Sequence, residues 1–192
     1  MSSTSGLAES GVGGRLNWLL GGALGGIVGA ILFGGVLWAV DPTIVTESIP
    51  QVYGLDGGDV VGWVFHLAHG LVLGTVFGFI ITRDVVLGTI TADVETPVLD
   101  AMGPSARIVF AGLVYGLAVW VLLPGVLLSI LVSVGGVTDP FPIASVYNLL
   151  GHMLYGMLLG ALVSVFVDLS RDVRDAEAPF EEATESSQEH RG

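Results

Sequence analysis

The stretch Val60–Thr82 reads VVGWVFHLAHGLVLGTVFGFIIT, which is 23 residues without an Asp, Glu, Lys or Arg. A helix that crosses the hydrocarbon core of a bilayer needs about 20 predominantly apolar residues. Helices buried inside soluble proteins are rarely this long and this free of charge. The stretch therefore predicts a transmembrane helix.

Three further runs have the same character, and the charged residues of the chain fall between and beyond the runs. Only 12% of the 192 residues are charged and 52% are hydrophobic, whereas soluble domains average about 25% charged residues. This composition excludes an ordinary soluble globular enzyme. We expect an all-α membrane protein whose domain at 16–167 contains four transmembrane helices, at about 16–40, 60–82, 108–134 and 144–167.

The two tails differ from the apolar runs in composition. Residues 1–15 are rich in Ser and Gly, and residues 168–192 carry eight of the acidic residues. Such segments cannot bury enough apolar surface to offset the entropy of ordering. We therefore expect a flexible N-terminal tail at 1–15 and a disordered acidic C-terminal tail at 168–192.

The distribution of arginines predicts the topology. The connections at about 41–59 and 135–143 contain no basic residue. Short cytoplasmic loops carry an excess of Lys and Arg, and acidic residues count little in this rule. We expect a multi-pass protein of the cell membrane with both termini and the 83–107 connection in the cytoplasm. The basic residues are Arg15, Arg83, Arg107, Arg171, Arg174 and Arg191.

The net charge of −12 and the absence of lysine and cysteine exclude further classes of partner and chemistry. Nucleic acid partners are disfavoured because phosphates need basic residues, and a polybasic patch for anionic lipid is absent. Acid excess without lysine is typical of a halophilic archaeon, where molar salt screens self-repulsion. The lack of cysteine excludes disulfides, thiolate metal sites and thiol catalysis.

The second half of the chain resembles the first. Residues 66–74 read HLAHGLVLG and residues 152–160 read HMLYGMLLG, so a histidine and two glycines recur 86 residues apart. A looser match links 25–29 with 111–116. We expect a tandem repeat of a two-helix hairpin. Because each copy crosses the membrane twice, the copies are parallel, with a pseudo-two-fold axis along the membrane normal. The alternative is chance similarity among helices rich in Gly, Leu and Val.

Small residues recur every four positions on each predicted helix, which is the GxxxG pattern. Four residues are about one helical turn, so each set lines one face. Glycine lets helices approach closely in lipid, where no hydrophobic force drives them together. We interpret these glycines as packing strips and expect self-association through them. The strips are Gly21, Gly25 and Gly29; Gly70, Gly74 and Gly78; Gly112 and Gly116; and Gly156 and Gly160.

The candidate polar or ligand face consists of His66, His69, His152, Asn148 and Tyr155. Polar side chains within the bilayer are costly unless they find partners. Asn148, Tyr155 and the other histidine are among the candidate partners, and Asn148 lies one turn before His152. Three interpretations stay open: an interhelical hydrogen bond, a site for a proton, small ligand or metal of unknown identity, and a haem b held by two axial histidines.

Two segments of the chain resemble other proteins. One is the Gly-Trp-x-x-His pattern ending at His66, and the other runs from Asn148 to Gly160, with Tyr115–Trp120 and Pro124 before it. Over about residues 16–167 the chain resembles a group of small haloarchaeal four-helix integral membrane proteins, whose members are sometimes labelled histidine kinases. The resemblance implies the architecture and no residue-level activity, because no ATP-binding motif is present.

No nucleotide loop, Ser/His/Asp arrangement or HExxH motif occurs in the sequence, and these are the common signatures of catalysis. We therefore expect a non-enzymatic structural or accessory component without a cofactor, embedded in the lipid bilayer. It would act as a homo-oligomer or with a membrane protein partner. One alternative is a small transport or channel-like module that uses the histidine face, and a second is a haem-b electron carrier.

Overall fold

The computed structural model describes residues 17–91, 101–123 and 146–189. This part of the chain is almost entirely helical and contains no strand. Its helices are α1 (Asn17–Val40), η1 (Ile44–Ser48), α2 (Ile49–Val52), α3 (Asp59–Ile81), α4 (Asp84–Thr91), α6 (Pro104–Leu122) and α8 (Val146–Glu189).

Four of these helices are long and apolar enough to cross a membrane. They are α1, α3, α6 and the Val146–Val167 part of α8. The expected all-helical membrane architecture with four candidate spans is confirmed. The end of the third expected span, at 124–134, and the expected N-terminal tail at 1–15 lie outside the described residues.

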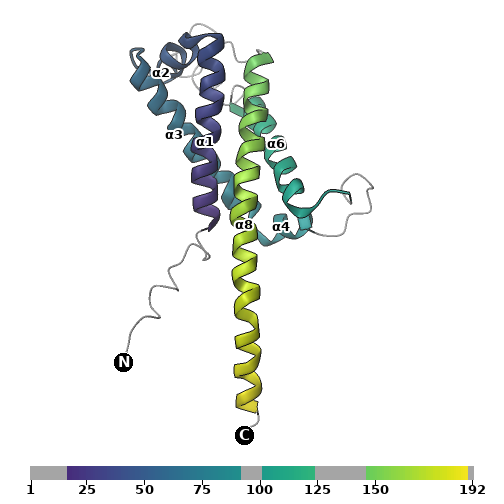
Figure 1. Ribbon diagram of the computed structural model, residues 1–192. Coiled ribbons are helices and arrows are strands. Elements are labelled where there is room, and N and C mark those ends of the chain that lie inside the picture. Colours follow the sequence, from purple (N-terminus) through teal and green to yellow (C-terminus); the bar gives the residue numbers. More distant parts are fainter. Residues whose placement is uncertain (1–16, 92–100, 124–145, 190–192) are drawn as a thin grey trace, which may run out of the picture.

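The structure differs from expectation in the segment that follows the last span. The α8 helix continues to Glu189 (Figure 1), where we expected a disordered tail. Extending an existing helix needs no new nucleus, and the segment is rich in Ala, Glu and Arg, which favour helix. The 83–107 connection holds the short helix α4. Pro104 begins α6, earlier than the expected start at 108, and proline is tolerated in the first turn of a helix.

The long helices pack in a definite order. The main contacts join α1 to α3, α6 to α8, and α1 to α8. By comparison α3 and α6 touch at few positions. Two sequential hairpins, α1–α3 and α6–α8, are thus joined chiefly through α1 and α8 (Figure 1).

Glycines bring the helices of each hairpin into main-chain contact. A Cβ added at Gly22 would lie 2.5 Å from the carbonyl oxygen of Gly74, and one added at Gly26 would collide with the carbonyl of Gly70. In the second hairpin, a Cβ at Gly112 would collide with the carbonyl of Gly156. No larger side chain fits at such positions unless the helices separate.

A second strip on α1 faces α8. A Cβ at Gly21 would lie 3.1 Å from Phe166, and one at Gly29 would lie 2.8 Å from the Tyr155 ring. A Cβ at Gly25 would contact Leu159 at 3.0 Å. Each of these glycines already contacts another helix of the same chain. A second copy of the chain could pack against them only if the bundle opened. The contacts that these glycines make in the structure are therefore contacts between helices of one chain.

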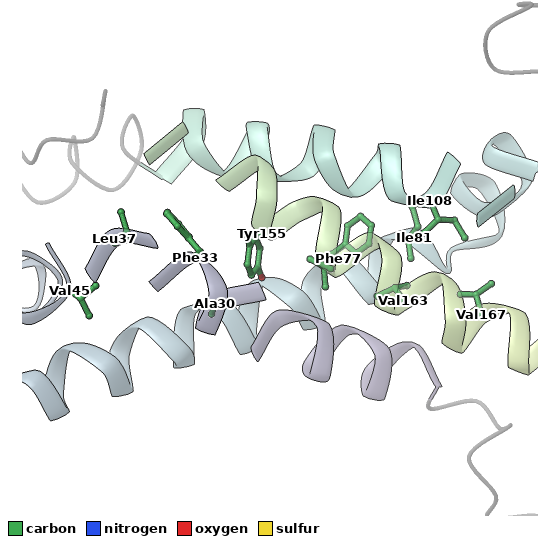
Figure 2. Close-up of a cluster of buried hydrophobic side chains, with 11 residues drawn as sticks. Ala30, Phe33, Leu37, Val45, Phe77, Ile81, Ile108, Tyr155, Val163 and Val167 are labelled. Carbon is green, nitrogen blue, oxygen red and sulfur yellow. The ribbon is translucent and has the colours of Figure 1, made fainter. Parts of the chain in front are cut away.

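The core lies along the α1–α8 interface and extends to α3 and α6. Figure 2 shows Phe33, Tyr155 and Phe77 spaced along the bundle, with Val163 and Val167 at one end. The outer faces are apolar as well; Val64, for example, is 58% exposed. Exposed apolar surface of this extent suits a lipid environment and would be a liability in water.

Candidate functional site

Among the described residues, the buried polar side chains are Asn17, His66, Asn148 and Ser164, and the Tyr155 ring is buried with its hydroxyl group. In an apolar surrounding each such group needs a hydrogen-bond partner. The partners found in the structure therefore decide what these residues can do.

His66 links the two helices of the first hairpin. Its Nε2 lies 2.9 Å from the carbonyl oxygen of Ala30 on α1. A carbonyl oxygen only accepts, so the imidazole carries its proton on Nε2 and donates it. Small residues on α1 make room for the ring, since a Cβ at Gly34 would lie 2.8 Å from the His66 Cδ2. His66 thus makes an interhelical hydrogen bond, which was one of the three interpretations, but its acceptor was not among the expected partners.

His152 has its hydrogen-bond partner within its own helix. Its Nδ1 donates to the main-chain carbonyl of Asn148 at 2.8 Å. The expected neighbour is therefore correct, but the accepting atom belongs to the main chain and not to the Asn148 side chain. This bond joins no second helix to α8.

Phe33 on α1 contacts both of these imidazoles. Its ring centroid is 5.6 Å from that of His66 and 4.7 Å from that of His152, and both contacts are edge-on. Phe33 also fills the space over Gly151, where an added Cβ would collide with the ring. Sequence reasoning missed Phe33, because an aromatic residue in an apolar run carries no signal of what it faces.

His69 bonds a residue that lies outside the four long helices. Its Nε2 bonds the hydroxyl of Tyr53, and the two rings stack at 5.7 Å. Tyr53 follows α2 and also packs against Phe65, so it holds the α2 segment against α3. Burial raises the pKa of the Tyr53 phenol, and the group is neutral at ordinary pH.

Two tyrosines of the second hairpin bond to α3. The hydroxyl of Tyr155 donates to the carbonyl of Gly70 at 2.9 Å, and that of Tyr115 donates to the carbonyl of Leu73 at 2.8 Å. Tyr155 is therefore not a partner of His66. Sequence reasoning missed Tyr115 as a site residue. Its signal was its position, because Tyr115 is next to Gly116 and lies on the same helix face as Ala111, four residues earlier.

The imidazoles of His66 and His152 have partners within the chain. The Nε2 of His66 donates to the carbonyl of Ala30, and both rings pack against Phe33, whereas a haem would need both imidazoles to face one iron. Within the described ranges, no three His, Asp or Glu side chains are grouped so as to hold a metal ion. What the arrangement does chemically is to hydrogen-bond side chains to helix carbonyls.

The fold and these contacts define a polytopic α-helical protein with four helices suited to crossing a membrane. Comparison with protein families, curated proteins and solved structures found no match to this chain.

The two histidine bonds lead to different expectations for mutation. His66→Phe keeps most of the ring volume and removes the interhelical bond, so it should cost roughly 0.6–1.7 kcal/mol of stability. His152→Phe removes only an intrahelical bond and should cost less. The measurement is the thermal unfolding midpoint of both variants in one mild detergent. A larger loss in the His152 variant would contradict the assignment.

Proposed function

We propose that this protein is a non-enzymatic structural or accessory component of the cell membrane. The observation that carries the proposal is that its buried and half-buried polar groups bond helix main chain. His66, Tyr115 and Tyr155 each donate to a main-chain carbonyl of another helix, and Asn17 reaches the carbonyl of Phe166 at 3.4 Å. A catalytic site instead aims several polar groups at one shared space.

A structural role requires a partner, and such a partner would pack against the outer apolar faces. The glycine strips are occupied inside the chain, whereas α1 and α3 expose Leu, Val and Ile along their length. We expect the full chain, tagged and crosslinked in its native membrane, to co-purify with one membrane protein at fixed stoichiometry. Mock-tagged membranes are the control.

Transport is the outcome that would overturn this proposal. The purified chain in sealed liposomes should give no ion flux above that of empty liposomes. A flux that disappears in the double variant His66→Phe and His152→Phe, while that variant still unfolds cooperatively above the assay temperature, would identify a transport module on the histidine face instead.

We further propose that the two hairpins are copies of one ancestral unit, arranged in parallel about a pseudo-two-fold axis along the membrane normal. Support comes from close helix contacts that recur with every residue number raised by 86. The Gly26–Gly70 contact recurs as Gly112–Gly156, the Gly22–Gly74 contact as Ile108–Gly160, and the Ala30–His66 contact as Gly116–His152.

For the topology, we propose that both termini and the α3–α6 connection lie in the cytoplasm. The arginine distribution supports this orientation, because Arg83 follows α3 and Arg107 lies in the first turn of α6. The chain has no cysteine, so single cysteines report without background. Asp56→Cys should react with an impermeant maleimide in intact cells. The matched variant Ala101→Cys should react only after permeabilisation, and the reverse pattern would invert the topology.

A further inference from the structure

Arg83 is held in one position at the end of α3. Its Nε donates to the carbonyl oxygen of Phe79 at 3.0 Å, and its guanidinium carbon lies 4.1 Å from the centroid of the Phe79 ring. Trp18, at the start of α1, packs edge-on against the same ring, with centroids 5.6 Å apart. The three side chains form one cluster at the neighbouring ends of two membrane-spanning helices, and we name it the Arg83 cluster.

The guanidinium of Arg83 keeps unused donors. An arginine has five N–H groups, and only the Nε group of Arg83 has an acceptor among the described residues. Arg107 differs, since it donates to the carbonyls of Met102 and Ile90 and so fastens α4 to the start of α6. Arg107 therefore stabilises the fold, whereas Arg83 is exposed and has N–H groups available for a ligand.

The position of the Arg83 cluster corresponds to the headgroup region of a bilayer. Arg83 follows the last apolar turn of α3 by two residues, and tryptophan is enriched at membrane–water interfaces. Directly after Arg83 the chain enters α4, whose Val85 is 81% exposed. An exposed valine beside the end of a span suits a helix that lies along the membrane surface.

We propose that the Arg83 cluster binds the phosphate of a glycerophospholipid and favours an anionic headgroup. The planar guanidinium fork matches two phosphate oxygens, and its stacking on Phe79 orders it before the lipid arrives. Charge complementarity supports this occupant. The chain carries a net charge of −12 with six basic residues, so an anionic lipid is attracted only near its few arginines, and among them Arg83 is exposed with donors that the described part of the fold does not use.

The test uses the full chain in neutral detergent, titrated with short-chain phosphatidylglycerol and followed by native mass spectrometry. Arg83→Gln should weaken the tightest lipid-binding step about fivefold. Arg83→Lys keeps the charge but loses the fork, so it should fall between. Arg174→Gln removes the same charge elsewhere on the chain and should leave this step unchanged.

Two further arms distinguish a lipid site from a site for free phosphate and from lipid binding that ignores the headgroup. Inorganic phosphate at the lipid concentration should not displace the bound lipid, and phosphatidylcholine should bind more weakly than phosphatidylglycerol. The proposal is overturned if Arg83→Gln binds phosphatidylglycerol as the wild type does, if Arg174→Gln weakens binding equally, or if free phosphate competes. Unfolding midpoints in detergent without added lipid verify that each variant is folded.

Discussion

Gly74→Leu and Gly160→Leu are each expected to destabilise the bundle by about 3 kcal/mol or more. The added side chain would meet rigid main chain in both cases. A Cβ at Gly74 would collide with the carbonyl of Gly22, and one at Gly160 would lie 2.7 Å from the carbonyl oxygen of Ile108. Helix backbone cannot move aside locally, so the two helices of the hairpin must separate.

The measurement is the unfolding midpoint of each purified variant in a mild detergent. Gly35→Leu is the matched control, because Gly35 lies on α1 with nothing within 4 Å of an added Cβ. That variant should stay within about 0.5 kcal/mol of the wild type. If all three variants melted alike, close main-chain contact would not be what holds the hairpins together.

Tyr155→Ala should have the second large effect, a loss of about 3–5 kcal/mol. The side chain is 3% exposed, and its ring packs against Gly29 of α1 while its hydroxyl bonds Gly70 of α3. One residue of α8 thus contacts both helices of the first hairpin. Truncation leaves a cavity where the two hairpins meet, and glycine neighbours have no side chains with which to fill it.

Two companion variants separate packing from hydrogen bonding. Tyr155→Phe keeps the ring and loses only the hydroxyl bond, so about 0.6–1.7 kcal/mol should be lost. Tyr147→Ala truncates a tyrosine that is 56% exposed on the same helix and should change little. The prediction fails if Tyr155→Phe costs as much as Tyr155→Ala in unfolding measured in the same detergent.

The candidate site was predictable in its members and less so in its pairings. The position of His66 within an apolar span correctly indicated that its side chain would bond a partner. The choice of Ala30 as acceptor had no sequence signal, because every residue offers a carbonyl. Likewise, the sequence treats His69 and His66 alike, and the partner Tyr53 becomes visible only once the α2 segment lies against α3.

The glycines show the same difference between what spacing predicts and what only packing shows. Spacing alone indicates that α1 carries two adjacent strips, one through Gly22 and Gly26 and one through Gly21, Gly25 and Gly29. Only the packing shows that the first faces α3 and the second faces α8. Both strips have the same composition, and the side chains opposite them come from distant parts of the chain.

By itself the sequence determined that the chain is helical, apolar and divided into four candidate spans, because these properties follow from composition and local periodicity. The tertiary structure decided that the glycine strips face helices of the same chain, that Phe33 contacts both His66 and His152, and that Tyr155 joins the hairpins. The physical reason is that apolar helices have many equally apolar faces. Which faces meet depends on the shape of both partners and on which carbonyls come within reach of a donor.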